Sequence, residues 1–332
     1  MVMNGPAPTL DVVLTTWTPS PVVDGLVVAG VIAYPVMVAR VRRGGGGWPV
    51  GRSVCWYLGL VCLVVTVDSA LATYAHSLFA VHMVVHLMMI MVVPALLVGA
   101  QPMRLLYNAS GPRGRAMLDR AGGWRLLRVL VSAWFTVPLY AAVIVLTHLT
   151  GFQQAMATHM WIHDGELVLY FISGYLLLVR LLGDEGVVKR PRPHPLRLFV
   201  LAVCMGPDTL VGVTLMMTSS VLAPAFAASR GWGPGALADQ HAAGVLMWVG
   251  GDGLMMLLMV IVAGQWVRSG EGSLGPWLDS VRRGATLGEF GPQSLGIDDE
   301  QAALDAYNAR LADLNGPRPR PGLGTRSQED MT

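Results

Sequence analysis

The sequence predicts an all-α polytopic membrane protein, a bundle of seven transmembrane helices with its N-terminus outside and its C-terminus in the cytoplasm. Of the 332 residues, 53% are hydrophobic and 13% are charged, and this charged share is about half that of a soluble domain. Apolar blocks fill the chain up to about residue 270, and the remainder is polar. No stretch has the alternating segments of about ten residues that form a membrane β-barrel. These observations exclude a water-soluble enzyme, a nucleic-acid-binding protein and a disordered chain.

Seven stretches are apolar over the length of about 20 residues that crosses a bilayer. In chain order they are 22–41, 54–74, 78–100, 127–149, 161–182, 196–218 and 241–267. They form a predicted transmembrane domain over 22–267, between an outer N-terminal segment (1–21) and a cytoplasmic polar tail (268–332). Acidic residues open a short helix in the tail near 298–315, and Gly316 and Pro317 end it.

The orientation follows from the basic residues, which collect in loops on the cytoplasmic side of a membrane. With the spans above, 22 of the 23 Lys and Arg residues fall in loops one, three and five or in the C-terminal tail, and Arg230 alone falls on the opposite side. The N-terminus is therefore predicted to be outside.

The eight histidines are the most informative residues. Only one of them, His194, falls on the cytoplasmic side. The other seven fall at the outer ends of the predicted spans or in an outer loop, namely His76, His82, His86, His148, His159, His163 and His241. Histidines from several helices are thus expected to gather at one depth in the membrane.

Two histidine pairs, His82/His86 and His159/His163, have the i, i+4 spacing that puts both side chains on one face of a helix. A single histidine near a membrane interface is more commonly a hydrogen-bonded residue than a ligand. Polar residues that face a bundle interior in numbers are commonly functional. Two pairs at the same depth therefore favour a metal or haem site, with His148 and His241 as further ligands.

Methionines continue the same stretches and point to the metal. Met89 follows His86 by three residues, and Met156 precedes His159 by three. Methionine also fills apolar cores, but a thioether beside imidazoles favours Cu(I) over hard cations. Zinc would accept the imidazoles alone, whereas calcium or magnesium would require clustered oxygen ligands. Glu166 is expected to orient the ring of His163 from outside the ligand set.

Two carboxylates, Asp208 and Asp252, fall near the centre of the predicted bilayer. They either pair with each other's neighbours, carry protons, or sit protonated in a hydrogen-bonded core. The three cysteines lack the spacing of a zinc site or a disulfide framework. No motif for covalent catalysis is present, so the sequence favours a protein that is not an enzyme.

Two motifs carry a resemblance to a known family. The third predicted span begins with HMVVHLMMIMVVP (His82–Pro94) and is followed by GAQP (Gly99–Pro102). The last predicted span begins with DQHAAG (Asp239–Gly244), which leads to Met247 and Trp248. Both resemble signatures of the CtaG-type cytochrome c oxidase assembly factors, and the segment from His148 to His163 fits the middle histidine region of that family. The resemblance covers about residues 22–267.

The resemblance implies a multi-pass protein of the bacterial cell membrane that helps to mature haem–copper oxidases. It implies that Cu(I) is bound on the outer side and supplied to the CuB centre of the oxidase catalytic subunit, with a copper donor protein as a second partner. His82, His86, His159 and His163 are expected to form the core of this site, with Met89 and Met156 as soft secondary ligands.

Two other classes stay open. One is a copper transporter of the copper-resistance type, which would carry the ion inward. The other is a cytochrome, because histidines from facing helices can ligate haem b.

Overall fold

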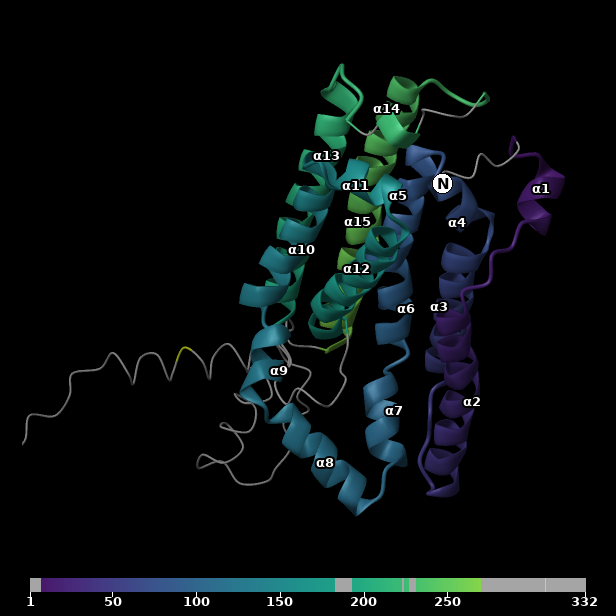
Figure 1. Cartoon of the computed structure of the whole chain (residues 1–332). Helices are drawn as coiled ribbons and strands as arrows, with labels where there is room; N and C mark the ends of the chain where they lie inside the picture. The colour runs from purple at the N-terminus through teal and green to yellow at the C-terminus, as the bar shows by residue number, and fades with distance from the viewer. Residues whose placement is uncertain (1–6, 183–192, 223, 227–230, 270–307, 309–332) are drawn as a thin grey trace, which may run out of the picture. The chain divides into compact units, whose positions relative to one another are not determined.

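The computed structural model describes residues 7–182, 193–222, 224–226, 231–269 and Asn308, and the regular structure in these residues is helical (Figure 1). The chain divides into two compact units, residues 1–264 and residues 265–332. The helices that carry the predicted histidine site belong to the first unit. The predicted tail helix near 298–315 lies outside the described residues, apart from Asn308.

Six helical stretches are long and apolar enough to cross a membrane, within the described residues. Four are single helices and two contain a wider, π-helical turn. The single helices are α2 (Pro21–Arg43), α3 (Val50–Asp68), α12 (Met160–Leu181) and α13 (His194–Met217). The first composite stretch, Phe79–Ala109, consists of α5 (Phe79–Leu87), the π turn η1 (Met88–Val92), α6 (Val93–Gly99) and α7 (Pro102–Ala109). The second, Ala236–Ser269, consists of α14 (Ala236–Val245), the π turn η3 (Leu246–Gly250) and α15 (Gly251–Ser269).

The helix expected to be the fourth span is shorter than the others. Instead of a continuous helix over 127–149, the chain forms α9 (Arg125–Leu130) and α10 (Ala133–Leu149), because Ser132 is extended and serves as the N-cap of α10. With 17 residues α10 is apolar but falls below the length of the other six. The count of seven spans and their orientation therefore stay predictions.

The second span also ends earlier than expected, at Asp68. Ser69 is extended there and its hydroxyl accepts a hydrogen bond from the N–H of Leu71, which starts the short helix α4 (Ala70–Ala75). The Asp68 carboxylate accepts a hydrogen bond from the N–H of Ser20 (2.8 Å). This bond ties the start of α2 to the end of α3. Four further short helices complete the described part: α1 (Leu10–Thr15), α8 (Pro112–Gly122), α11 (Phe152–Thr158) and the 3₁₀ turn η2 (Pro224–Phe226).

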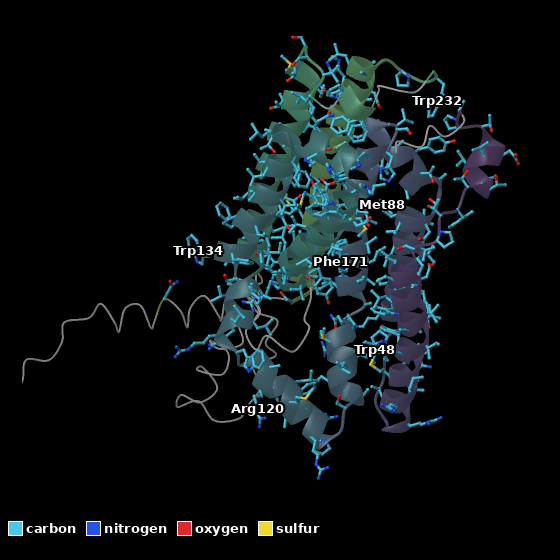
Figure 2. The ribbon with its side chains drawn as sticks, in the orientation of Figure 1. Trp48, Met88, Arg120, Trp134, Phe171 and Trp232 are labelled. Carbon is cyan, nitrogen blue, oxygen red and sulfur yellow. The ribbon has the colours of Figure 1, made fainter. Side chains whose placement is uncertain are left out.

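The stretch that contains α5, η1 and α6 is the central one. In the most apolar part of this stretch 67% of the residues are buried, whereas in that of α2 11% are. The segments α5, η1 and α6 of the central stretch contact α3, α12 and α14, and its last segment, α7, contacts α2. Trp134 at the start of α10 is 94% exposed and points away from the bundle (Figure 2). Apolar side chains exposed in this way match a lipid environment.

Glycines allow the helices to approach closely at two places, as small residues do in membrane bundles. A Cβ on Gly174 of α12 would lie 1.8 Å from the carbonyl oxygen of Ile90 in η1. A Cβ on Gly212 of α13 would lie 2.8 Å from the carbonyl oxygen of Gly244 in α14. The first contact presses α12 against the central helix, and this contact positions the side chains described next.

Candidate metal centre

Three helices bring four histidines and one glutamate together in the interior of the bundle. His82 and His86 come from α5, His148 from the end of α10, and His163 and Glu166 from the first turns of α12. All five side chains are buried, with at most 5% of any residue exposed. Because His82 and His86 lie one helical turn apart, their rings stand on one face, with centroids 4.0 Å apart.

The Glu166 carboxylate lies between these two rings. Oε1 is 3.5 Å from Nε2 of His86, and Oε2 is 3.8 Å from Nε2 of His82. One ligand atom from each of the three residues lies within 4.8 Å of the others. Among the described residues, this is the one group of three or more His, Cys or carboxylate side chains close enough to share a metal ion.

Many of the polar atoms in the cluster lack a hydrogen-bond partner. They are both ring nitrogens of His82, Nε2 of His86, Nε2 of His163 and both carboxylate oxygens of Glu166. Buried polar atoms are nearly always hydrogen-bonded, and leaving one without a partner destabilises a protein by about 1–3 kcal/mol. A group of such atoms facing one another is typical of a site that is completed by a ligand.

His148 is held in one orientation by its backbone and its neighbours. Its Nδ1 lies 2.8 Å from the carbonyl oxygen of Ile144, which can only accept, so the proton is assigned to Nδ1. Tyr170 and Thr147 support this side of the ring, because the Tyr170 hydroxyl lies 2.6 Å from Oγ1 of Thr147 and 3.3 Å from Nδ1. The unprotonated Nε2 then lies 3.2 Å from Nδ1 of His86 and 3.2 Å from the sulfur of Met83.

A row of imidazoles leads from this cluster toward the surface. The ring of His163 lies 5.8 Å from that of His82 and 4.5 Å from that of His76, at the end of α4. Nδ1 of His163 lies 3.7 Å from Asp164, whose side chain is 76% exposed. Burial lowers the pKa of His76, and nearby Asp164 partly opposes this effect. His76, which the sequence left without a role, therefore extends the cluster as a neutral imidazole at neutral pH.

The structure does not bring His159 into the cluster. The expectation that His159 and His163 share a helix face is wrong, because α12 begins at Met160 and His159 is its extended N-cap (φ −131°, ψ 110°). Its ring is exposed, 6.4 Å from that of Trp161, and its Nδ1 lies 3.2 Å from the carbonyl oxygen of Ala155. The spacing rule fails because it holds only inside a helix.

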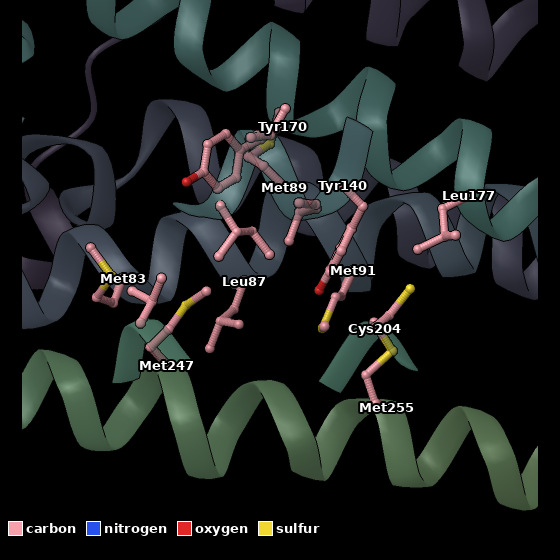
Figure 3. Packing of buried hydrophobic residues seen from close by; sticks show 14 of the residues in the cluster. Met83, Leu87, Met89, Met91, Tyr140, Tyr170, Leu177, Cys204, Met247 and Met255 are labelled. Carbon is pink, nitrogen blue, oxygen red and sulfur yellow. The ribbon is translucent and has the colours of Figure 1, made fainter. Parts of the chain in front are cut away.

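Three further expected ligands come from segments other than α5, α10 and α12, and their role as ligands stays a prediction. Met156 is buried in the apolar core from the separate helix α11, and Met89 is buried in η1, among the core side chains that Figure 3 labels. His241 contacts the carbonyl oxygen of Thr218 through Nε2 (3.3 Å), at the end of α13. The methionine whose sulfur contacts an imidazole is Met83, one turn before His86.

Asp239, the first residue of the DQH motif, positions the helix that carries His82 and His86. Its carboxylate accepts hydrogen bonds from the N–H groups of Phe79 (2.8 Å) and Ala80 (3.1 Å), the first two residues of α5. Gln240 accepts a hydrogen bond from the N–H of Leu222 (2.9 Å) and donates one to the carbonyl oxygen of Ser220 (3.1 Å). The sequence gives one indication that Asp239 caps α5. Leu78, the N-cap residue of α5, has no side-chain oxygen that could accept a hydrogen bond from the first N–H groups of the helix.

The two carboxylates near the predicted bilayer centre are hydrogen-bonded, as one of the three sequence interpretations expects. Tyr140 donates to Asp208 (2.9 Å), and Thr209 donates to Asp252 (2.8 Å). These bonds link α10 to α13 and α13 to α15. Proton transfer through them stays a prediction.

Comparison with known proteins places these observations in a family. The chain is 29% identical over 321 residues to uncharacterized proteins of Mycobacterium bovis and Mycobacterium tuberculosis, and 28% identical over 314 residues to one of Mycobacterium leprae. These alignments cover 94%, 94% and 92% of this chain but 46%, 46% and 45% of the relatives, so the chain spans about half the length of the curated relatives that it matches. No solved structure matches the chain. Residues 32–269 match the family described as cytochrome c oxidase caa3 assembly factor (Caa3_CtaG). The chain, with its apolar helices and its histidine motif on the central one, therefore belongs to the cytochrome c oxidase caa3 assembly factor family.

Proposed function

We propose that this protein is a non-enzymatic assembly factor of the bacterial cell membrane that binds Cu(I) and supplies it to the CuB centre of a haem–copper oxidase. The observation that carries the proposal is the arrangement of His82, His86 and Glu166 inside the bundle, where both ring nitrogens of His82, Nε2 of His86 and both carboxylate oxygens of Glu166 lack hydrogen-bond partners. Membership of the oxidase assembly family supports the role. The partners would be the oxidase catalytic subunit and a copper donor on the outer side.

The protonation assigned to the rings of His86 and His148 supports a bound cation between His86 and Glu166. Because Nε2 of His148 has no proton, Nδ1 of His86 donates to it, and Nε2 of His86 then carries a lone pair. This lone pair points toward Oε1 of Glu166, which is also an acceptor when ionised. Two acceptors in contact repel each other in a buried site, and a bound cation converts this repulsion into attraction.

The composition of the cluster favours a transition metal over a hard cation. Two imidazoles and one carboxylate suit copper or zinc, whereas calcium and magnesium prefer six or more oxygen ligands. The sulfur of Met83, in contact with His148, adds a soft donor beside the site. Soft donors select Cu(I) among the metals that imidazole binds.

The arrangement gives less support to the other two classes. Bis-histidine ligation of haem requires the flat macrocycle to lie between two imidazoles, but His86 and His148 contact each other directly, with 3.2 Å between Nδ1 and Nε2. A transporter requires ligands along a path, and the described residues hold one metal-ligand group, on the side predicted to be outside. A visible absorption spectrum of the purified protein tests for haem.

The experiment that tests the proposal is a comparison of His86→Ala with His159→Ala. Both variants remove one imidazole, but only His86 belongs to the cluster. Copper affinity is measured on the purified proteins by competition with a chromophoric Cu(I) chelator, and the copper and haem contents of the oxidase are measured in cells that carry each variant. We expect His86→Ala to lower copper affinity at least tenfold and to deplete CuB while haem is retained, with partial rescue by added copper.

His159→Ala is expected to behave as the unmodified protein in both measurements. If His86→Ala retains full affinity, or if the unmodified protein binds no Cu(I), the copper proposal fails. A scaffold that only holds the oxidase subunit during assembly would then be the better account.

A further inference from the structure

His86 presents its two ring nitrogens to two different groups. Nε2 faces Glu166, 3.5 Å away, and Nδ1 faces Nε2 of His148, 3.2 Å away. The ring is 1% exposed, and it packs against the ring of Tyr170 with centroids 4.1 Å apart. His86 thus lies between two groups of possible ligands. The proposed function uses the group on the Nε2 side, with Glu166, and leaves the group on the Nδ1 side, with His148, without a role.

The second group has the construction of a ligand set. The hydrogen bond from Nδ1 of His148 to the carbonyl oxygen of Ile144 fixes the ring with the lone pair of Nε2 directed at His86 and Met83. Metal-binding histidines commonly donate their second ring N–H to a backbone carbonyl in this way, because the bond fixes both tautomer and orientation. Tyr170 and Thr147 brace the same edge of the ring.

Met83 supplies the third donor of this group. It precedes His86 by three residues on α5, is completely buried, and lies in the packed interior that Figure 3 shows together with Met247. Its sulfur is 3.2 Å from Nε2 of His148. A thioether has no proton to donate, so the contact places two lone-pair donors side by side. Two imidazoles and one thioether form a softer set than two imidazoles and one carboxylate.

From these contacts we infer a second Cu(I) position, formed by Nδ1 of His86, Nε2 of His148 and the sulfur of Met83, which shares His86 with the position at His82 and Glu166. The inference rests on the proposed function, because it assumes that copper reaches the cluster. The two positions differ in chemistry: the carboxylate-bearing position tolerates harder ions, and the thioether-bearing position selects Cu(I). The second position therefore supplies the selectivity for Cu(I) that the first one lacks.

Occupation of the second position changes the protonation of His86. With copper held there, Nδ1 of His86 would give up the proton that it donates to His148. Nε2 of the same ring would carry a proton in its place and direct it at Glu166. The ring stays neutral, and the numbers of protons before and after are equal.

The test is X-ray absorption at the copper edge of the purified full-length protein loaded with one equivalent of Cu(I). We expect a sulfur neighbour of copper in the unmodified protein and its loss in Met83→Leu, with Cu(I) affinity lowered about tenfold and Zn(II) affinity unchanged. Leucine is close to methionine in volume, so the core is expected to tolerate the change. Met255→Leu is the matched control, because Met255 is also completely buried but belongs to α15; this variant should keep the sulfur signal.

A copper spectrum of the unmodified protein with nitrogen and oxygen neighbours only would overturn the second position while leaving the proposed function intact. Retention of the sulfur neighbour in Met83→Leu would overturn it as well, because another residue would then be the donor. Absence of any copper binding would refute both proposals. The first of these outcomes needs no variant, so the inference is testable even if Met83→Leu does not fold.

Discussion

The carboxylate of Asp239 accepts a 2.8 Å hydrogen bond from the backbone N–H of Phe79, a residue 160 positions earlier in the chain. Phe79 is the first residue of α5, and the same carboxylate also binds the N–H of Ala80. These N–H groups have no partner within their own helix. A side chain on α14 thus caps the helix that carries His82 and His86, and it connects the two motifs on which the family resemblance rests.

Removal of this cap is expected to destabilise the protein and to weaken the metal site together. Asp239→Ala leaves one buried and one partly buried N–H group without an acceptor, and the loss of a helix cap destabilises a protein by about 0.5–2 kcal/mol. We expect a lower melting temperature and a Cu(I) affinity reduced several-fold. Unfolding can be followed with a thiol-reactive dye, because Cys204 is buried in the folded protein.

Asp164→Ala serves as the control for the melting temperature in this prediction, since its side chain is 76% exposed. Unchanged stability in Asp239→Ala would show that water replaces the carboxylate, and that α5 does not depend on α14 for its position.

The contrast between His82 and His159 shows what a single sequence can predict. The i, i+4 rule correctly joins His82 to His86, because both lie inside α5. It fails for His159 and His163, because the helix begins between them, at Met160. The helix start has no strong sequence signal, as histidine is not a preferred N-cap residue. Three of the four histidines expected at the core therefore lie in the cluster, and His159 lies outside it.

Other parts of the site depend on contacts that a single sequence does not encode locally. Met83 contacts His148 across 65 positions, and Asp239 reaches α5 across 160. The π turn at Met88–Val92 also changes the helical repeat directly after His86, so counting forward to Met89 did not identify Met83 as the methionine whose sulfur contacts His148. The helical fold and most of the apolar stretches were predictable because they follow from the length of continuous apolar segments in the sequence.

Gly174 is expected to be indispensable for the packing of α12. A Cβ at this position would lie 1.8 Å from the carbonyl oxygen of Ile90, which belongs to the backbone and cannot rotate away. Gly174→Ala should destabilise the protein by about 3 kcal/mol, at the upper end of overpacking effects, and should lower Cu(I) affinity because Glu166 moves with α12. Gly165→Ala, in the same helix with open space around its Cα, is the matched control. Equal melting temperatures of the two variants would contradict the close approach.

The predicted orientation is tested by labelling from outside the cell. Gly235 is exposed, has φ −60° and has open space for a side chain, so Gly235→Cys is expected to fold normally. In a background without the native cysteines, this residue should react with a membrane-impermeant maleimide in intact cells. A reporter fused after Thr332 should be active only if it functions in the cytoplasm. Labelling that requires permeabilised membranes would reverse the topology and place the histidine cluster on the cytoplasmic side.

Glu166→Gln is expected to raise the melting temperature of the metal-free protein and to lower its affinity for Cu(I). The carboxylate faces Nε2 of His82 and Nε2 of His86 at 3.8 and 3.5 Å, and neither of its oxygens has a hydrogen-bond partner. A glutamine has nearly the same shape but can donate an N–H to one of these ring nitrogens, so the metal-free variant should melt a few degrees higher than the unmodified protein. Because the negative charge is lost, Cu(I) affinity should fall at least tenfold, which corresponds to about 1.4 kcal/mol. Melting curves with and without Cu(I), together with chelator competition, measure both effects on the same samples. If Glu166 only holds the helices together, the variant will melt at a lower temperature and keep its copper affinity, and the carboxylate will have to be removed from the ligand set.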